Sequence, residues 1–344
     1  MNNVKLAFDD VLLKPQYSDI ESRSLIDISN NLYAGYTLEV PIIASPMDTV
    51  SETDMAIAMH RAEALAVLHR YNSIEEQIDL ARGIYMGGMC QTAAAIGVTG
   101  DYMQRAVELA KAGVNIICLD AAHGHHINME LALKQLRREL GYNIHIMAGN
   151  VATAEGFQSL IDWGADSIRV GIGGGSICTT RMQTGHGIPT FQSILDCAAY
   201  ARSSGVKLIA DGGIKNSGDI VKCLAAGADF VMLGSLLAGT EEAPGLVSCD
   251  ATTSQKYKQY RGMASFDAQK DFKGPSYHIE GVASRVPYRG PVAEVINNLT
   301  AGIRSGLSYT GARSLEQFRN KAQFIRQSVN STKESSAHIL LRNA

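Results

Sequence analysis

The chain lacks the patterns that mark membrane-spanning, secreted and nucleic-acid-binding proteins. None of its apolar runs approaches the roughly 18 residues of a membrane-spanning helix, and residues 1–15 contain no uninterrupted apolar core of a signal peptide. Its formal net charge of -3 gives no basic excess to attract nucleic acid or an anionic membrane surface. We therefore expect a cytoplasmic protein whose partners are small molecules, with neither nucleic acid nor a membrane among them.

Paired cysteines are also absent. The six cysteines are scattered singly, with no C-x-x-C pair for zinc binding or dithiol exchange, and disulfides are improbable in the cytoplasm. Cys118 and Cys223 lie in apolar or alanine-rich segments and are expected to be structural, and Cys249 is expected in a loop. Only Cys178 has the polar surroundings of a reactive thiol.

What the chain does have is a glycine-rich loop around that cysteine, Gly171-Ile172-Gly173-Gly174-Gly175-Ser176-Ile177-Cys178-Thr179-Thr180-Arg181. Glycines allow positive φ and let the backbone approach a ligand or ion closely. A cysteine presented on such a loop is typical of a catalytic nucleophile, and a neighbouring arginine favours its thiolate form. The alternative is an inert cysteine in a simple turn; the polar flanks favour catalysis.

Eight short apolar runs, each followed by a helical pattern, predict the strands of an α/β protein: 41–45, 65–69, 93–98, 114–119, 144–148, 166–170, 206–210 and 229–233. Three are preceded by turns with a glycine, Gly113, Gly164 or Gly227, expected to end a helix. A doubly wound dinucleotide-binding sheet needs G-x-G-x-x-G after its first strand, and none occurs there. We predict a single (β/α)8 TIM barrel domain over residues 1–344.

Small and polar residues follow the predicted strands at the end where barrels carry their sites. The segments are Ser45-Pro46-Met47-Asp48, Asp120 to His126, Gly149-Asn150, the cysteine loop, Asp211-Gly212-Gly213 and Gly234-Ser235. The last two are placed to seat a phosphate on backbone amides. Asp211 is expected to accept hydrogen bonds from a ribose, the alternative being a helix N-cap. For His123, His125 and His126 a metal site is the weaker interpretation, and a substrate-edge or structural role the stronger.

The segment after the last strand, about 250–290, is too long for an ordinary connection and is predicted to be a functional flap. Helices are predicted over 292–306 and 314–328. The residues from about 328 to 344 are polar and are expected to form a mobile tail or an intersubunit arm.

The whole chain resembles the IMP dehydrogenase and GMP reductase family of purine nucleotide enzymes. The resemblance runs in order through Phe8 to Pro15, Met47 to Val50, Asp120 to His125, Ala148 to Thr153, the cysteine loop, Ala210 to Ile214, Gly234-Ser235 and Tyr260 to Met263. It implies a (β/α)8 barrel, usually a homotetramer, in which Cys178 adds to C2 of a purine mononucleotide. Two positions depart from the family pattern: Gly174 replaces a proline, and Arg169 stands where lysine is usual.

The resemblance also implies roles for individual residues. Catalysis falls to Cys178, Thr180 and Glu280, and cofactor binding to Asp120, Ala121, Asn150 and Arg169. Nucleotide binding falls to Ser45, Met47, Ser176, Asp211, Gly212, Gly213, Gly234, Ser235, Tyr260, Gly262 and Met263. Backbone carbonyls of Gly173, Gly175 and Cys178 match those that can hold a potassium ion.

Two family reactions are possible, and the flap discriminates between them. Family dehydrogenases oxidise IMP to XMP with NAD and activate water with an arginine-tyrosine pair on the flap; the interval from Met263 to Glu280 contains no arginine. The reductase converts GMP to IMP and ammonia with NADPH and needs no such base. The chain also lacks the tandem regulatory (CBS) module that many dehydrogenases insert after the second helix. We therefore expect a GMP reductase, with IMP dehydrogenase as the alternative and a catalytically silent purine-nucleotide-binding barrel as a third interpretation.

Overall fold

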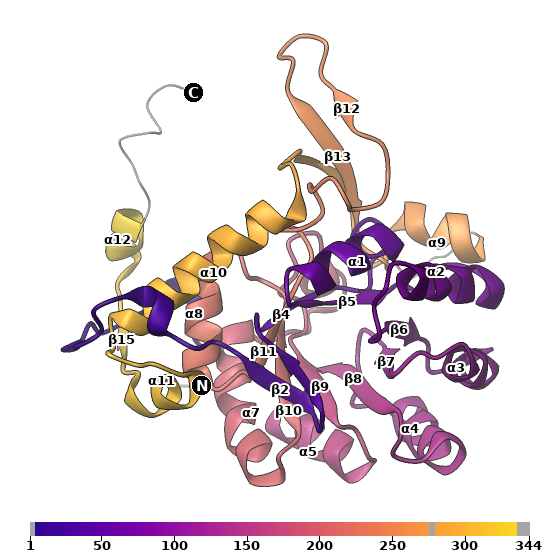
Figure 1. Ribbon diagram of the computed structural model, residues 1–344, viewed down its shortest axis with the longest axis horizontal. Coiled ribbons are helices and arrows are strands. Elements are labelled where there is room, and N and C mark those ends of the chain that lie inside the picture. Colours follow the sequence, from indigo (N-terminus) through magenta and orange to yellow (C-terminus); the bar gives the residue numbers. More distant parts are fainter. Residues whose placement is uncertain (1–3, 275–278, 336–344) are drawn as a thin grey trace.

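A computed structural model describes residues 4–274 and 279–335. Its centre is a closed barrel of eight strands in the order β10-β11-β4-β5-β6-β7-β8-β9, every neighbouring pair parallel (Figure 1). The barrel strands are β4 (Ile42–Ala44), β5 (Leu65–Leu68), β6 (Ala93–Ile96), β7 (Ile116–Asp120), β8 (His145–Val151), β9 (Ser167–Val170), β10 (Lys207–Asp211) and β11 (Phe230–Leu233). All eight predicted strands and the TIM barrel are confirmed.

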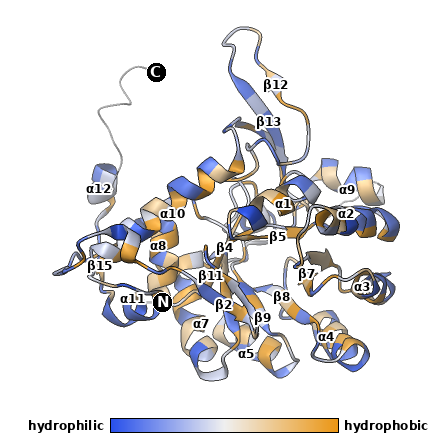
Figure 2. Cartoon of the chain, viewed as in Figure 1, coloured by the Kyte–Doolittle hydropathy of each residue, from blue (hydrophilic) through white to orange (hydrophobic). Residues whose placement is uncertain are grey.

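Helices surround the barrel and cover its outer face (Figure 1). They are α1 (Thr53–Arg61), α2 (Ile74–Met86), α3 (Tyr102–Lys111), α4 (Ile127–Leu140), α5 (Ala154–Asp162), α7 (Thr190–Ser204), α8 (Ser217–Ala226) and α10 (Val292–Ser308), whereas the short α6 (Thr180–Thr184) has no buried residue and continues the cysteine loop. Gly113, Gly164 and Gly227, each with positive φ, follow α3, α5 and α8 as predicted. In Figure 2 these helices carry both apolar and polar colours, because one face of each packs on the barrel and the other meets solvent.

Two apolar cores result from the alternation of side chains along the strands. On β4, Ile42 belongs to the core between barrel and helices, whereas Ile43 belongs to the core inside the barrel. The hairpin of β2 (Asn30–Tyr33) and β3 (Tyr36–Leu38) supplies Leu32 and Leu38 to the inner core and so plugs the barrel. The barrel interior is therefore filled, which leaves the loops at the strand ends to form the site.

Next to this plug lies a buried histidine, His145 at the start of β8. Its ring stacks on Tyr33 with centroids 5.2 Å apart, and Nε2 is 2.9 Å from the Ser167 hydroxyl. Burial lowers the pKa of His145 to about 4, while an unfolded histidine titrates near 6.5. Between these two pKa values the unfolded chain binds a proton that the folded chain does not, so stability falls as pH drops through this window.

We expect His145 to make the wild-type free energy of unfolding fall by about 2 kcal/mol between pH 7 and pH 5. In His145→Gln that contribution disappears, although the variant is less stable at both pH values because the ring leaves Tyr33. Urea unfolding of both proteins at the two pH values measures the difference. Parallel pH dependences in the two proteins would contradict a neutral buried His145.

The flap region contains regular structure. A three-stranded antiparallel sheet of β12 (Ser248–Cys249), β13 (Lys256–Arg261) and β14 (Ala283–Pro287) projects from the barrel (Figure 1), and the flap also contains the helix α9 (Phe266–Lys273). Residues 275–278 of the flap lie outside the described residues. Ring stacking of Phe272 on Tyr71, with centroids 4.7 Å apart, docks α9 onto the loop after β5.

The C-terminal region departs from the sequence prediction at one helix. The helix expected over 314–328 ends early: α11 (Leu315–Lys321) is followed by β15 (Phe324–Arg326), which pairs antiparallel with β1 (Val11–Leu13). Backbone pairing with a strand some 300 residues away outweighs local helix preference here. The helix expected over 292–306 is confirmed as α10.

Short helices lie near both ends of the described part of the chain. They are η1 (Phe8–Asp10), η2 (Arg23–Leu25), α12 (Val329–Thr332) and η3 (Lys333–Ser335). The expected tail continues over 336–344, which lie outside the described residues. Among residues 4–274 and 279–335, no helix combines the length and apolar character needed to cross a bilayer.

Candidate active site

One cavity of about 280 Å³ opens where the barrel strands end, under the start of the flap. Every candidate site residue lines it, although they come from the ends of six barrel strands and from the flap. They are Ser45, Met47, Asp120, Ala121, Asn150, Arg169, Gly173, Gly175, Ser176, Cys178, Thr180, Asp211, Gly212, Gly213, Gly234, Ser235, Tyr260, Gly262, Met263 and Glu280. Their individual roles stay predictions; their assembly at one place is a finding.

The half-buried Cys178 begins a chain of hydrogen bonds. Its Sγ donates to Thr180 Oγ1 at 3.1 Å, and that hydroxyl donates to Glu280 Oε2 at 2.7 Å. Both hydrogen bonds point from the thiol toward the carboxylate. The arrangement can therefore pass the thiol proton through one hydroxyl to Glu280 and leave a thiolate.

Backbone pairing of the flap with the cysteine loop holds Glu280 in place. Thr179 N–H donates to the Glu280 carbonyl at 2.9 Å, and Val282 N–H donates to the Ile177 carbonyl at 3.0 Å. Cys178 and Gly281 thus form an antiparallel bridge. A carboxylate 100 residues away in sequence is thereby fixed next to the thiol.

Arg181, which was expected to favour the thiolate, forms its hydrogen bond to a backbone carbonyl beyond the cysteine loop. Its Nη2 donates to the carbonyl of Ile188 at 3.0 Å, and its side chain covers Gly173 and Gly187. The partner of the Cys178 thiol is Thr180. Position 181, in the first turn of α6, places the guanidinium against the Ile188 carbonyl, and the influence of Arg181 on the thiolate stays a prediction.

The cysteine loop needs glycine at particular positions. Gly171 has φ +147°, and a Cβ there would overlap the carbonyl oxygen of Asp211. A Cβ on Gly174, the position where the family carries proline, would collide with Thr190 Oγ1. Thr190 is buried and its hydroxyl has no hydrogen-bond partner in the described part of the chain. Thr190 therefore occupies the space that a side chain at position 174 requires.

We expect Gly174→Ala to lower turnover about tenfold or more and to cost about 1–3 kcal/mol of stability, because overpacking displaces the cysteine loop. Adding Thr190→Ala removes the obstructing hydroxyl and recovers most of both losses. Thr190→Ala alone serves as control and is nearly neutral, since that hydroxyl has no partner to lose. Activity and thermal unfolding of the three variants test the pair; a double variant as impaired as Gly174→Ala would refute the steric explanation.

The side chains of Tyr260, Ser45 and Met47 converge on Gly234, which directly follows β11. A Cβ there would lie 2.7 Å from Tyr260 Oη, 3.2 Å from Ser45 Oγ and 3.3 Å from Met47 Sδ. Ser45 is buried, and its hydroxyl has no partner among the described residues. Burial raises the pKa of Tyr260 to about 12, so its phenol stays a neutral donor. This corner therefore holds one hydroxyl, that of Ser45, without a partner among the described residues, whereas Tyr260 Oη donates to Met47 Sδ at 3.9 Å.

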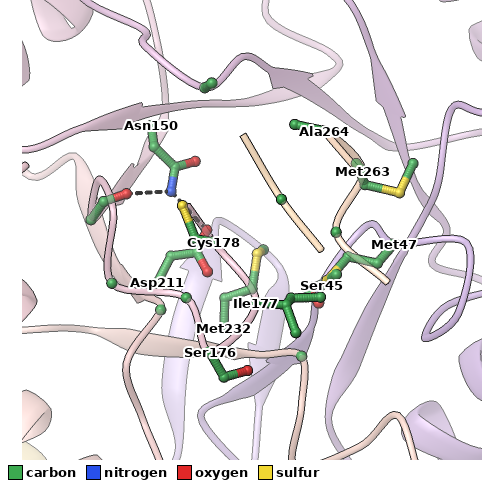
Figure 3. Close-up of a pocket in the computed structure, with 18 of the residues that line it drawn as sticks. Ser45, Met47, Asn150, Ser176, Ile177, Cys178, Asp211, Met232, Met263 and Ala264 are labelled. Carbon is green, nitrogen blue, oxygen red and sulfur yellow. Dashed lines mark hydrogen bonds between the residues drawn. The ribbon is translucent and has the colours of Figure 1, made fainter. Parts of the chain in front are cut away.

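Asp211, at the end of β10, faces this cavity together with Asn150 (Figure 3). Asn150 Nδ2 donates to Asp211 Oδ2 at 2.8 Å and to the Gly171 carbonyl at 2.8 Å. The alternative role of Asp211 as a helix N-cap is wrong: the residue that caps α8 is Asn216, whose side chain accepts from Asp219 N–H. The carboxylate remains available to a ligand.

Asp120, at the end of β7, is held between two guanidinium groups. Arg169 Nη1 donates to its Oδ1 at 2.7 Å, and Arg70 Nε donates to its Oδ2 at 3.2 Å. Burial alone raises the pKa of Asp120, but the charges of Arg169 and Arg70 outweigh it and hold the pKa below its ordinary value. Asp120 is therefore a carboxylate at neutral pH.

Sequence reasoning missed several residues that line the cavity, notably Arg70, Tyr71 and Met232. Arg70 and Tyr71 directly follow β5, so the rule that barrel sites lie after strand ends would have found them. Tyr71 Oη donates to the Met263 carbonyl at 2.6 Å and so ties the flap to the barrel. Met232 faces inward on β11, where the alternation of side chains was the available signal.

The three histidines after β7 have structural contacts. His126 accepts from Asn128 N–H at 3.1 Å and caps α4, and His125 contacts Ser159 and the Trp163 ring. Within the described residues, no group of three or more His, Cys, Asp or Glu side chains is placed to hold a metal. Cys118 and Cys223 are buried, as expected of structural cysteines, and burial raises the pKa of each thiol. Cys249, expected in a loop, lies instead on the short strand β12, where it is exposed.

Comparisons with known proteins agree with this geometry. A family model described as the IMP dehydrogenase / GMP reductase domain matches residues 5–338. The chain is 36% identical to inosine-5'-monophosphate dehydrogenase of Cryptosporidium parvum, covering 97% of this chain and 94% of that protein. It is 32% identical to GMP reductase of Leishmania major, covering 97% and 96%. A crystal structure of a cysteine-to-alanine variant of Trypanosoma brucei GMP reductase, in complex with guanosine 5'-monophosphate, superposes with TM-score 0.91 at 30% identity and covers 98% of both chains.

Proposed function

The chain belongs to the IMP dehydrogenase / GMP reductase family of oxidoreductases, and on this premise we propose that it is a GMP reductase. In that reaction GMP, NADPH and two protons give IMP, NADP+ and an ammonium ion. The observation that carries the choice between the family's two reactions is the flap: residues 264–279 contain no arginine. Hydrolysis of a covalent purine intermediate to XMP needs a base for water, whereas loss of ammonia does not.

The hydrogen-bonded chain from Cys178 supports the deamination step. The thiol proton passes to Glu280 through Thr180, and the thiolate adds to C2 of the guanine ring. Glu280 returns the proton to the 2-amino group, the C2–N bond breaks, and ammonia leaves. What remains is a thioimidate in which Sγ is bonded to C2, with no water added.

The second step is hydride addition to C2, which breaks the C2–S bond and releases IMP and the thiolate. The nicotinamide cofactor supplies this hydride when bound. Asp120, Ala121 and Asn150 line the part of the cavity proposed for its ribose and carboxamide, and the ionised Asp120 suits ribose hydroxyls. Asp211 is proposed for the ribose of GMP, and the corner at Gly234 for its phosphate. Carbonyl oxygens of Gly173, Gly175 and Cys178 are proposed as potassium ligands, since hard oxygens suit such a cation.

IMP dehydrogenase is the second candidate, and the relatives of that name favour it. Ser45-Pro46-Met47 and Glu280 to Tyr288 also resemble that branch. It requires a water-activating group other than the missing arginine.

Parallel assays test the proposal. Purified protein is mixed with GMP and NADPH, and separately with IMP and NAD+, while nicotinamide absorbance and ammonia are followed. The proposal predicts NADPH consumption with equal amounts of ammonia and IMP. XMP and NADH formed only from IMP and NAD+ would establish the dehydrogenase instead.

A further inference from the structure

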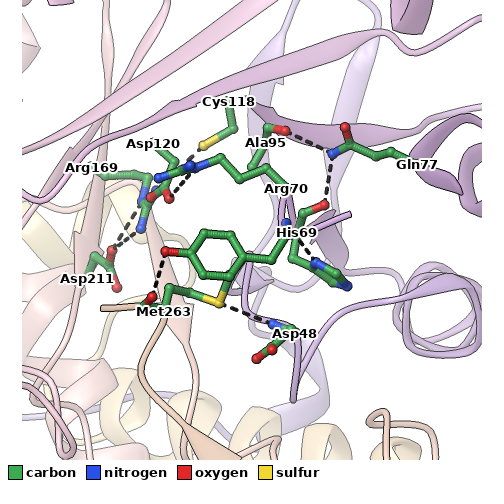
Figure 4. A network of polar contacts seen from close by, with 11 residues as sticks. Asp48, His69, Arg70, Gln77, Ala95, Cys118, Asp120, Arg169, Asp211 and Met263 are labelled. Carbon is green, nitrogen blue, oxygen red and sulfur yellow. Dashed lines mark hydrogen bonds and ion pairs between the residues drawn. The ribbon is translucent and has the colours of Figure 1, made fainter. Parts of the chain in front are cut away.

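A charged side chain joins the two halves of the cavity. Arg169, on β9, reaches Asp120 at the end of β7 with Nη1 at 2.7 Å. It reaches Asp211 at the end of β10 with Nε at 3.1 Å and Nη2 at 2.9 Å. Figure 4 shows its guanidinium between the two carboxylates. Arg169 Nη1 also donates to Cys118 Sγ at 3.6 Å, and the side chain is only 8% exposed, so these protein contacts, and not solvent, determine where the guanidinium lies.

The oxygens of the two carboxylates differ in how many hydrogen bonds they already accept. Asp211 Oδ2 accepts from Arg169 and from Asn150, while its Oδ1 receives no donor from the described residues. Both oxygens of Asp120 are engaged, Oδ1 by Arg169 and Oδ2 by Arg70. A ligand hydroxyl therefore finds a free oxygen on Asp211, but on Asp120 it must share an oxygen with a guanidinium.

We propose that Arg169 is a positioning residue that couples the two subsites, so that a nucleotide bound at Asp211 strengthens binding of the cofactor at Asp120, and the reverse. This inference rests on the proposed function for the assignment of Asp211 to the nucleotide ribose and Asp120 to the nicotinamide ribose. A sugar hydroxyl on Asp211 Oδ1 fixes that carboxylate. The rigid guanidinium attached to it, and through Nη1 the carboxylate of Asp120, are fixed with it. The second ligand then meets an ordered partner, and linkage makes the effect reciprocal.

The geometry requires arginine. A planar guanidinium carries donors at both ends and serves two carboxylates at once, whereas an ammonium is a point charge on a flexible stem. Lysine at position 169 keeps the positive charge but holds one carboxylate at a time. Arg169→Lys is therefore expected to separate coupling from binding. Arg70→Lys is the matched control, because Arg70 donates to Asp120 but not to Asp211.

The experiment uses IMP with NADPH, a pair that reacts in neither family direction. The Kd of each ligand is measured by calorimetry with and without a saturating amount of the other. For the wild type we expect each ligand to lower the Kd of the other by about 5-fold or more, the usual range for coupled sites. In Arg169→Lys this ratio falls to about 1, while Arg70→Lys weakens NADPH and keeps the ratio. A wild-type ratio of 1, or an unchanged ratio in Arg169→Lys, would overturn the proposal.

A second measurement keeps the test valid if Arg169→Lys does not fold. In the wild type, 2′,3′-dideoxy-IMP has no hydroxyl to donate to Asp211, so we expect it to bind without strengthening NADPH. A full coupling ratio with this analogue would contradict the inference. Failure of the proposed function gives a different result. In that case the protein does not turn over GMP, but IMP still lowers the Kd of NADH when NADH replaces NADPH. Failure of the coupling leaves GMP turnover intact with a ratio of 1.

Discussion

Replacing Cys178 with alanine is expected to lower turnover by about 10⁴-fold or more, because no other side chain can form the bond to C2 on which both steps depend. Binding of GMP is expected to change less than about threefold, since the contacts proposed for ribose and phosphate lie at Asp211 and Gly234. Steady-state kinetics and calorimetry with GMP measure the two effects.

The matched control is Cys249→Ala. That thiol is exposed on β12, outside the cavity lining, so its loss is expected to leave turnover within about twofold of wild type. Turnover by Cys178→Ala at the wild-type rate would eliminate the covalent mechanism. Loss of GMP binding in Cys178→Ala would mean instead that Cys178 contributes to binding GMP before any reaction occurs.

Replacing Glu280 with glutamine is expected to slow ammonia release by about 10²- to 10³-fold, because the amide cannot take the proton that Thr180 passes on. Hydride transfer is expected to fall much less, since breaking the C2–S bond needs no proton from Glu280. Rapid mixing of GMP with NADPH reports the first step. The hydride step is followed through the isotope effect of NADPH deuterated at C4, which disappears from turnover when ammonia release alone limits the rate.

Asp267→Asn is the control for that experiment. It removes one carboxylate from the exposed first turn of α9, on the same flap, and leaves the Cys178 chain intact. Both of its steps are expected near the wild-type rates. Equal losses in the two steps of Glu280→Gln would remove the special role of the carboxylate in deamination.

The barrel could be predicted from the sequence because its strands are buried on both faces and therefore consist of continuous apolar runs. A run such as Ala93–Ile96 has no polar residue to interrupt it, and glycines such as Gly227 end the preceding helices. Elements that depend on distant partners were not legible. Pairing of β15 with β1 joins opposite ends of the chain, and the β2–β3 plug follows from the shape of the barrel interior.

The site was predictable as far as strand ends and the cysteine loop define it. Asp211 ends β10, Asn150 is the next-to-last residue of β8 and Cys178 follows β9, and parallel strands bring these ends together. Side-chain direction was the harder question. Arg181 is close to Cys178 in the sequence, yet its guanidinium binds the Ile188 carbonyl. Glu280 lies about 100 residues from Cys178 in the sequence, yet the backbone bridge between Cys178 and Gly281 brings its carboxylate into the hydrogen-bonded chain.

The most direct test of the central claim is to follow the transferred hydrogen. The protein is incubated with GMP and NADPH deuterated at both C4 positions, and the nucleotide product is analysed by mass spectrometry and NMR. The account predicts IMP that carries one deuterium at C2, with one ammonia released for each molecule formed. Product without deuterium at C2, or XMP as the product of the protein with IMP and NAD+ alone, would contradict it.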